Sequence, residues 1–554
     1  MFYGRRRMPS TSVPPPAEAI QPERVVDPDG WLVVASWTVI ALSAAQILLF
    51  SFGRDQGIYA TVADGILRGQ MPYRDVWDFK PPGIFLVYAL AQALFGKTML
   101  APRLLEVAGL IGMIVGFMRL SETFFGVKRV GLVGGAVAAL IHAQLEFWHT
   151  GQPETFGGFL TVWALVLTTR EGKRSRRLWR WAAIGALLGC AFLLKPPLGG
   201  GAIACAAYLA RDEWGQKAKW QAALLPFVVV ALGSLVPIAA CGLWFKARGA
   251  WDALYWTLFE FTPGYTKLGW TNRSAPEMFY WGLEELFFRF SALAALGFIA
   301  AIVIRPMHEN ERRGSFLILG VMAIHLAGIA MQGKFFQYHY AASLPLLALL
   351  GGLGLYKLWR RTLAAGASGV LAFVAFVGVA ISMRIAVRDL GSFWDRATLR
   401  TGYLLRMGPI HSRELLDKEL YRVADYNLDA SRQVALEVQR RTQPDAKIFI
   451  WGFEPGVYWM ADRAASTRYI YDVPQRVSWG RERARKELIA ELTANPPALF
   501  VTQRGDRFSW VTGDEYDSAE ALLHFPELAR IVEADFRLVT SIEDFDVYER
   551  RSGD

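Results

Sequence analysis

The sequence of 554 residues is 53% apolar, and its mean hydropathy is positive, at +0.23. Apolar runs of membrane length recur from Trp31 to about Ile385, a pattern that excludes an ordinary soluble protein. The net charge is +10, and the basic residues cluster between the apolar runs. Basic residues between apolar runs are typical of the cytoplasmic loops of membrane proteins, where they set the orientation of the chain. The clustering therefore argues against a nucleic-acid partner.

A polar N-terminal tail, residues 1–30, precedes the first apolar run. It includes three consecutive arginines, Arg5 to Arg7, which place the tail in the cytoplasm. No short apolar core with a small-residue cleavage site precedes Trp31. We therefore expect a retained signal anchor, at about 31–52, that leaves the membrane on the outer side.

A first outer loop is expected over residues 53–100. It contains one apolar stretch, Gly83 to Phe95, which is short for a span of about 20 residues. If this stretch crossed the membrane, the basic segment from Arg170 to Arg177 would lie outside. We interpret the stretch as a juxtamembrane or re-entrant helix, because all later basic loops then lie in the cytoplasm.

Ten further spans bring the predicted total to about eleven transmembrane helices in residues 31–385. They are expected at about 101–121, 130–148, 156–169, 181–195, 197–210, 221–245, 281–304, 315–331, 341–356 and 363–384. The predicted fold class is therefore a polytopic α-helical membrane protein.

The composition changes near residue 390, where apolar runs of membrane length stop. On this topology the segment 386–554 lies on the outer face, which is the periplasm in a Gram-negative bacterium. Buried strands are predicted at 447–451 and 498–501, a closing hairpin at 536–550, and helices at 430–441 and 481–494. Together these patterns predict a small extracytoplasmic α/β domain.

Charged side chains gather in the first outer loop, at the membrane boundary. Asp55, Asp78 and Lys80 lie there, with Tyr59 close by. Pairing or function is the usual reason for charges at this depth. A carboxylate can act as a general base on a hydroxyl, and a lysine can hold a phosphate as a point charge. The alternative is a solvated loop with ordinary surface charges.

Three later outer segments bring further polar groups to the same side of the membrane. The first contributes Glu154, the second Lys195, and the third Lys334 with His339 and Tyr340. As alternatives, Lys195 snorkels to the interface and His339 is an ordinary interfacial side chain. Taken together, the lysines and carboxylates predict a site for an anionic ligand.

Sequence motifs for other chemistries are absent. There is no HExxH, no GxxxxGK[ST], and no GxSxG in a strand-turn-helix setting. The seven histidines are scattered, so we predict no metal site and no cofactor, with a carboxylate-bound divalent cation as the alternative. We interpret Glu146 as helix-end polarity outside the site.

The segment Arg54 to Ala60, followed by Pro72-Tyr73 and by Asp78 to Gly83, resembles the first-loop signature of the GT-C superfamily of membrane glycosyltransferases. Within that superfamily it is similar to the bacterial relatives of the protein O-mannosyltransferases and of the lipid A aminoarabinose transferases. Looser similarities extend over most of residues 31–385.

The resemblance implies a polyprenyl-phosphate-linked sugar as donor and a site at the outer membrane surface. It implies that Asp55 is the catalytic base and that Lys80 contacts the carrier phosphate, while Glu154 corresponds to the acidic residue after the third span. Many relatives carry Asp-Glu where this chain has Asp55-Gln56. That difference argues against a paired, metal-holding site.

We therefore expect an inverting, single-displacement sugar transfer to a lipid, polysaccharide or protein acceptor, at the outer face of the bacterial inner membrane. Lys80, with Lys195 or Lys334, would neutralise charge on the leaving phosphate. Contacts with substrate are expected from Tyr59, Asp78, Glu154, His339 and Tyr340. The alternative is a transporter or flippase of anionic lipid-linked sugars, which usually carries repeats and charges at the midplane.

Overall fold

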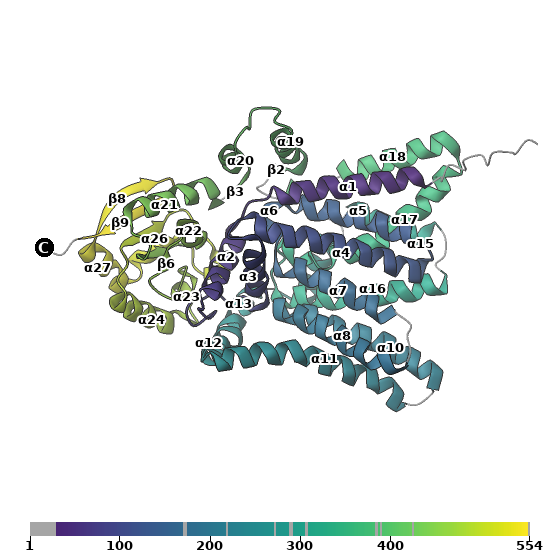
Figure 1. The fold of residues 1–554 in the computed structure, drawn as a ribbon, viewed down its shortest axis with the longest axis horizontal. Helices are drawn as coiled ribbons and strands as arrows, with labels where there is room; N and C mark the ends of the chain where they lie inside the picture. Colours follow the sequence, from purple (N-terminus) through teal and green to yellow (C-terminus); the bar gives the residue numbers. More distant parts are fainter. Residues whose placement is uncertain are drawn as a thin grey trace, which may run out of the picture.

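The computed structural model describes residues 29–169, 174–217, 220–270, 273–286, 292–304, 308–382, 386–387, 391–423 and 426–551. Within this part of the chain, a bundle of long helices lies beside a smaller region built on a five-stranded sheet (Figure 1). The arginines of the N-terminal tail and residues 170–173 of the basic segment lie outside the described residues.

The bundle is made of long, mostly apolar helices. They are α1 (Gly30–Leu48), α4 (Leu100–Phe125), α5 (Lys128–Gln144), α7 (Pro153–Thr169), α8 (Arg174–Leu194), α10 (Gly201–Lys217), α11 (Trp220–Ala247), α15 (Ala292–Val303), α16 (Glu309–Gln332), α17 (Leu344–Leu363) and α18 (Gly366–Ser382). Within the described ranges, five of these are long and apolar enough to cross a membrane, namely α1, α4, α8, α11 and α16. The chain is a multi-pass membrane protein, as predicted, and the total of about eleven spans stays a prediction.

Glycines let α5 and α17 approach closely at the centre of the bundle. A Cβ added to Gly134 would lie 2.8 Å from the Cα atom of Leu349, and one added to Gly352 would lie 2.5 Å from the backbone nitrogen of Gly134. Small residues at such contacts stabilise helix pairs in membranes, because the backbones can meet. The contact fixes α17, which follows the short η3 helix (Gln337–Tyr340).

Two helices, α2 (Arg54–Leu67) and α3 (Gly83–Phe95), lie between the bundle and the sheet region (Figure 1). The predicted short helix and α3 have the same bounds. Helix α2, which begins one residue before Asp55, was not predicted within the first outer loop. Gln56 accepts a hydrogen bond from the backbone nitrogen of Gly53 at 2.9 Å and so caps the first turn.

The predicted span 130–148 is interrupted near its outer end. Helix α5 ends at Gln144, and α6 (Glu146–His149) follows after Leu145, with a φ of 64° at its first residue, Glu146. The Glu146 carboxylate is buried and pairs with Arg400 of α19 (Phe393–Leu404). Glu146 therefore ties this corner to the segment after the bundle and lies outside the cavity described below.

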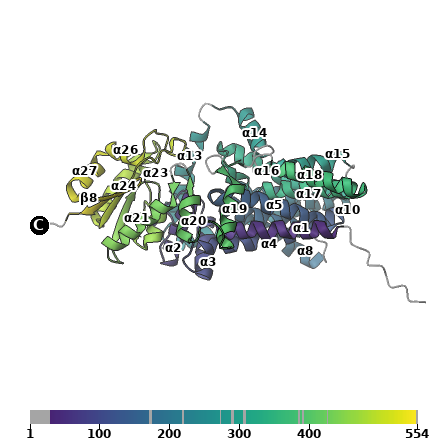
Figure 2. The same ribbon diagram turned by 90° about the horizontal axis from the view of Figure 1, so that it is seen from above.

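The long connection after α11 is helical. It forms α12 (Trp251–Tyr255), the π-helix η1 (Trp256–Phe261), α13 (Thr262–Gly269) and α14 (Ala275–Glu284). Seen from above, α14 projects from the side of the molecule (Figure 2). The predicted span 281–304 includes residues 287–291, which lie outside the described residues.

The five strands of the C-terminal region have the order β6-β5-β7-β9-β8. They are β5 (Lys447–Trp451), β6 (Ala464–Ala465), β7 (Leu499–Gln503), β8 (Phe536–Ile542) and β9 (Phe545–Arg550). Strand β5 runs parallel to β6 and β7, while β9 is antiparallel to β7 and β8. The predicted strands and closing hairpin are thus confirmed.

Helices surround this sheet, which makes the C-terminal region α/β as predicted. They are α21 (Leu428–Arg441), α22 (Gly456–Ala461), α23 (Val473–Arg476), α24 (Arg481–Ala494), α25 (Ser509–Thr512), α26 (Ser518–Leu523) and α27 (Pro526–Asp535). Every residue of β7 is buried, which is typical of a strand covered on both faces.

Short elements complete the chain. They are α9 (Pro196–Gly199) in the bundle, then β1 (Ala386–Val387), β2 (Gly391–Ser392), α20 (Arg413–Leu420), β3 (Arg422–Val423) and β4 (Tyr426–Asn427) between the bundle and the sheet.

Candidate active site

Asp55 lies in the first turn of α2, where the helix dipole stabilises an acidic side chain. Its Oδ2 atom accepts a hydrogen bond from Nε2 of Gln152 at 3.2 Å and lies 3.5 Å from Nζ of Lys80. The side chain is 24% exposed, so one edge of the carboxylate is open to a further partner.

Lys80 connects Asp55 to Tyr59. Its ammonium donates to the Tyr59 hydroxyl at 3.0 Å, and that hydroxyl donates to Oε1 of Gln152 at 2.8 Å. The four residues form a closed ring of polar contacts. Burial lowers the pKa of Lys80, but the nearby carboxylates of Asp55, Asp78 and Glu154 outweigh it and raise the pKa above its ordinary value. Lys80 is therefore a permanent cation.

Asp78 holds the loop that carries Lys80, rather than lining the cavity. Its carboxylate is buried, accepts a hydrogen bond from the Tyr471 hydroxyl at 2.6 Å, and accepts another from the backbone nitrogen of Lys80 at 3.2 Å. Burial raises the pKa of Asp78 above its ordinary value. Asp78 was predicted to contact substrate, but its carboxylate points toward the C-terminal region and supports the loop instead.

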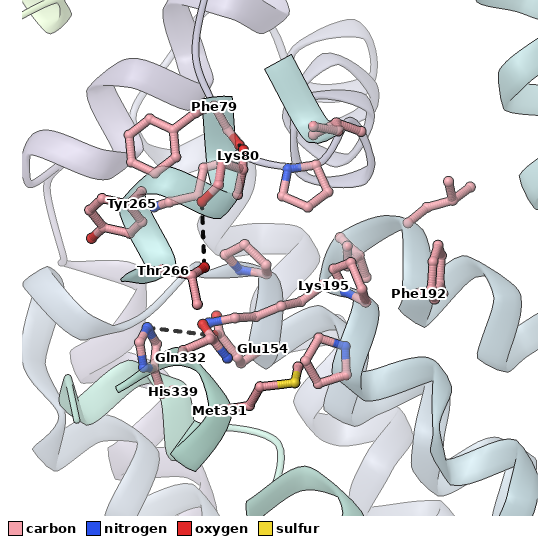
Figure 3. Close-up of a pocket in the computed structure, with 18 of the residues that line it drawn as sticks. Phe79, Lys80, Glu154, Phe192, Lys195, Tyr265, Thr266, Met331, Gln332 and His339 are labelled. Atoms are coloured by element: carbon pink, nitrogen blue, oxygen red, sulfur yellow. Dashed lines mark hydrogen bonds and ion pairs between the residues drawn. The ribbon is translucent and has the colours of Figure 1, made fainter. Parts of the chain in front are cut away.

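A cavity of about 380 Å³ opens beside Lys80 (Figure 3). Its polar lining includes Lys80, Glu154, Lys195, Tyr265, Lys334, Tyr338 and His339, and its apolar lining includes Phe79, Phe192, Leu258, Phe259 and Met331. The predicted lysines thus come together from three separate parts of the chain. The cavity combines cations at its base with apolar walls.

Glu154, Lys195 and His339 meet inside this cavity (Figure 3). Lys195 Nζ forms an ion pair with Oε1 of Glu154, and Nε2 of His339 lies 4.0 Å from the same oxygen. Burial, together with the neighbouring Lys195, holds the pKa of His339 well below its ordinary value, so the ring is neutral. His339 Nδ1 donates to the carbonyl of Lys334 at 2.5 Å, which leaves Nε2 as an acceptor.

Lys334 lies at the side of the cavity next to the C-terminal region. Its ammonium donates to the carbonyl of Trp510 at 2.7 Å and lies 3.2 Å from the centre of the Tyr265 ring. Burial and the charge of Lys80 lower the pKa of Lys334 to about 7. Of the three lysines, Lys334 therefore changes its charge near neutral pH.

Tyr340 lies outside the cavity, in the apolar core of the bundle, and is fully buried. Tyr338 lines the cavity instead, and its ring centre lies 5.8 Å from Nζ of both Lys80 and Lys195. Nothing in the sequence distinguishes these two tyrosines, because the η3 helix that contains both is too short to show a periodic pattern.

Sequence reasoning also missed Gln152, because an amide in a loop carries no charge signal. The loop is held by the buried carboxylate of Glu106, which accepts from the backbone nitrogen of Gly151 at 2.6 Å and from Arg103 at 2.8 Å. His142 lies 2.7 Å from the same carboxylate. Because Gly151 directly precedes Gln152, this cluster fixes the amide that contacts Asp55.

Gln56 points away from Asp55. Its Nε2 donates to the carbonyls of Thr150 and Phe147 at 2.6 and 3.2 Å, while Oε1 accepts from Gly53. A glutamate could accept at this position but could not donate, so the amide suits it. In the part of the chain that the structure describes, no group of three or more His, Cys, Asp or Glu could hold a metal ion.

Comparisons with known proteins agree with this architecture. The family model of the dolichyl-phosphate-mannose-protein mannosyltransferases matches residues 79–244. The crystal structure of ArnT from Cupriavidus metallidurans bound to undecaprenyl phosphate is similar over 94% of this chain and 98% of that chain, with a TM-score of 0.58 and 16% identity. The fold of this chain is therefore similar to that of ArnT.

The apo form of the same ArnT gives a comparable match, with a TM-score of 0.57 and 15% identity over 94% of this chain and 97% of that chain. No curated protein matches the sequence. Identity at this level shows the shared fold, and it leaves the roles of individual residues to the geometry above.

Proposed function

We propose that this chain is a glycosyltransferase of the GT-C type that moves a sugar from a polyprenyl-phosphate donor to a cell-envelope acceptor. The observation that carries the proposal is the contact between Asp55 and Lys80 at the edge of a cavity that Lys195 and Lys334 also line. A carboxylate beside clustered cations suits a reaction that removes a proton and releases a phosphate.

The donor phosphate would lie between Lys80 and Lys195. Both ammonium groups approach the ring of Tyr338, from which each lies 5.8 Å. An ammonium binds phosphate oxygens as a charged donor, and two of them neutralise more of the charge that develops on the leaving group. Lys195 would then exchange part of its contact with Glu154 for the phosphate.

The apolar side of the cavity suits the lipid part of such a donor. Phe192, Phe259 and Met331 line the cavity, yet their exposed fractions are 39%, 65% and 59%. Apolar side chains that are exposed at a cavity mouth in a membrane protein can contact hydrocarbon chains. The structure of ArnT with bound undecaprenyl phosphate is consistent with a carrier of this class.

The proposed reaction is a single displacement. Asp55 accepts the proton of an acceptor hydroxyl while that oxygen attacks the anomeric carbon. The bond between this carbon and the phosphate oxygen breaks, its electron pair stays on the phosphate, and polyprenyl phosphate leaves beside Lys80. Attack opposite the leaving group inverts the configuration of the sugar. The acceptor is a lipid, a polysaccharide or a protein, and no metal is needed for this sequence of steps.

We place this reaction at the outer face of the bacterial inner membrane. The charged groups of the cavity lie at the ends of helices, such as Glu154 at the start of α7 and Lys195 just after α8. Transporters usually bind their ligands near the membrane midplane. The positions of these groups therefore favour a transferase over a flippase.

The proposal is tested by comparing Asp55→Asn with wild-type protein in lipid, using a panel of labelled polyprenyl-phosphate sugars. We expect transfer to fall by about a hundredfold or more, because the amide cannot accept the proton. The matched control is Asp64→Asn, a carboxylate on the same helix that pairs with Arg68 and Lys97. Undiminished transfer by Asp55→Asn would show that the proposed mechanism is wrong.

A further inference from the structure

A second cavity, of about 550 Å³, lies at the opposite end of the bundle. Helices α7, α8 and α16 each contribute to both ends. Their outer ends lie at or next to Glu154, Lys195 and Lys334, while their other ends line the second cavity. The second cavity therefore belongs to the other membrane surface and is separate from the candidate active site.

Arginine side chains dominate the charge of this second cavity. Arg177 forms an ion pair with Glu213, and Arg313 forms one with Asp212 at 2.5 Å. Arg180 adds a third guanidinium to the lining. Three guanidinium groups and two carboxylates therefore line the cavity.

The donor groups at this wall include two that have no acceptor within the described residues. The indole Nε1 of Trp181 is one, and its side chain is only 1% exposed; the other is Nε of Arg177. Both groups can only donate. A buried donor without an acceptor is unfavourable, so a ligand that brings oxygen atoms would be stabilised there.

We propose that the second cavity binds the phosphate of an anionic lipid headgroup. Basic pockets between helix ends suit such headgroups, because the phosphate stays at the interface while the chains remain in the bilayer. The guanidinium of Arg177 stacks over Trp181 at 5.0 Å, and that of Arg313 over Tyr208 at 5.5 Å. These rings hold the planar donors in place for phosphate oxygens. Phe124 and Leu209 line the same cavity and would contact the start of an acyl chain.

The test measures the apparent melting temperature of purified full-length protein in detergent, titrated with phosphatidylglycerol, phosphatidylcholine or inorganic phosphate. We expect phosphatidylglycerol to stabilise the wild type at a lower concentration than phosphatidylcholine. Trp181→Phe keeps the ring and removes the indole donor, so its half-saturating concentration should rise about five- to tenfold. The double variant Arg177→Gln/Glu213→Gln should also raise the half-saturating concentration, and it leaves no carboxylate without its arginine.

The matched control is Arg119→Gln. Arg119 is exposed at the same end of the bundle, its guanidinium lies 5.3 Å from the Trp163 ring, and it does not line the cavity. It should bind phosphatidylglycerol as the wild type does. If inorganic phosphate stabilised the protein at the same concentration as phosphatidylglycerol, the second cavity would be a phosphate site whose ligand is the free ion. Equal responses to both lipids, with Trp181→Phe unchanged, would overturn the proposal.

Discussion

Two lysines of one cavity show how the surroundings of a residue set its charge. Lys80 is surrounded by carboxylates, which raise its pKa despite burial. Lys334 has the ring of Tyr265 and a carbonyl as its near partners, and burial with the charge of Lys80 lowers its pKa to about 7. Identical side chains therefore give one fixed cation and one that titrates.

The pH dependence of donor binding should reveal the titration of Lys334. Its ammonium is charged below about pH 7 and neutral above it, and an anionic phosphate favours the charged form. The KM for the donor should therefore rise as the pH increases from 6 to 8. Lys334→Arg stays charged throughout, so its KM should stay flat over that range. Lys97→Arg, outside the cavity, should follow the wild type, and a flat wild-type profile would contradict the assignment.

Gln56 allows a test of the departure from relatives that carry Asp-Glu. In Gln56→Glu, the new carboxylate would face the carbonyls of Thr150 and Phe147, to which the amide now donates. We expect the free energy of unfolding to fall by about 1–3 kcal/mol, because buried acceptors lose their donor. Detergent unfolding measures this change. A variant of unchanged stability whose transfer becomes dependent on Mn²⁺ would show that position 56 can hold a metal.

The sequence predicts which charged groups lie near the site, but it does not predict which way each side chain points. Lys80, Glu154, Lys195 and His339 follow from the topology, because charges at helix ends on one side of a membrane have little space in which to separate. The sequence could not show that Asp78 and Tyr340 point away from the cavity. Both belong to short segments, where no periodicity shows which side chain is buried. Their orientation depends on contacts with distant parts of the chain.

At the scale of elements, the contact between α3 and α8 sets the distance between two lysines. A Cβ on Gly83, the first residue of α3, would lie 2.7 Å from the carbonyl group of Leu193 near the end of α8. Lys80 lies three residues before this glycine, and Lys195 lies two residues after Leu193. The glycine therefore lets the two phosphate-binding candidates approach each other.

Gly83→Ala should reduce sugar transfer by roughly tenfold to a hundredfold, because the added methyl group would push α3 away from α8 and so move Lys80 away from Lys195. Gly112→Ala is the matched control, since a Cβ there meets only an ordinary contact of 3.7 Å with the Trp163 ring. Transfer rates at saturating donor measure the effect. Equal rates for the two variants would show that the α3–α8 contact does not position the site.

Elements with a clear local signal have the predicted bounds. Strand β5 is a short apolar run that begins at a charged residue and ends before a glycine, and helix α24 buries Ala484, Leu488 and Leu492 at a spacing of four residues. Helix α2 was missed, although Gly53 and Gln56 form a capping signal at its start. Its mean hydropathy is modest, and it is stabilised by contacts with α22 that no local pattern indicates.

For the whole molecule, orientation in the membrane is the prediction that remains to be measured. In a background without Cys190, Cys205 and Cys241, a membrane-impermeant maleimide should label Leu523→Cys on intact cells. Leu523 is 74% exposed in the C-terminal region. Glu122→Cys, whose side chain is 54% exposed at the opposite end, should react only after the cells are opened. The reverse pattern would place the candidate active site in the cytoplasm.

The contacts between the first outer segment and the C-terminal region also determine when the protein becomes active during its synthesis. Arg54 pairs with Glu454, and Tyr471 bonds Asp78, so the partners are 400 and 393 residues apart. The segment that carries Lys80 therefore leaves the ribosome long before the groups that hold it. In a nascent or truncated chain this segment would lack those contacts, and only a completed chain would hold Asp55 and Lys80 in the arrangement described above.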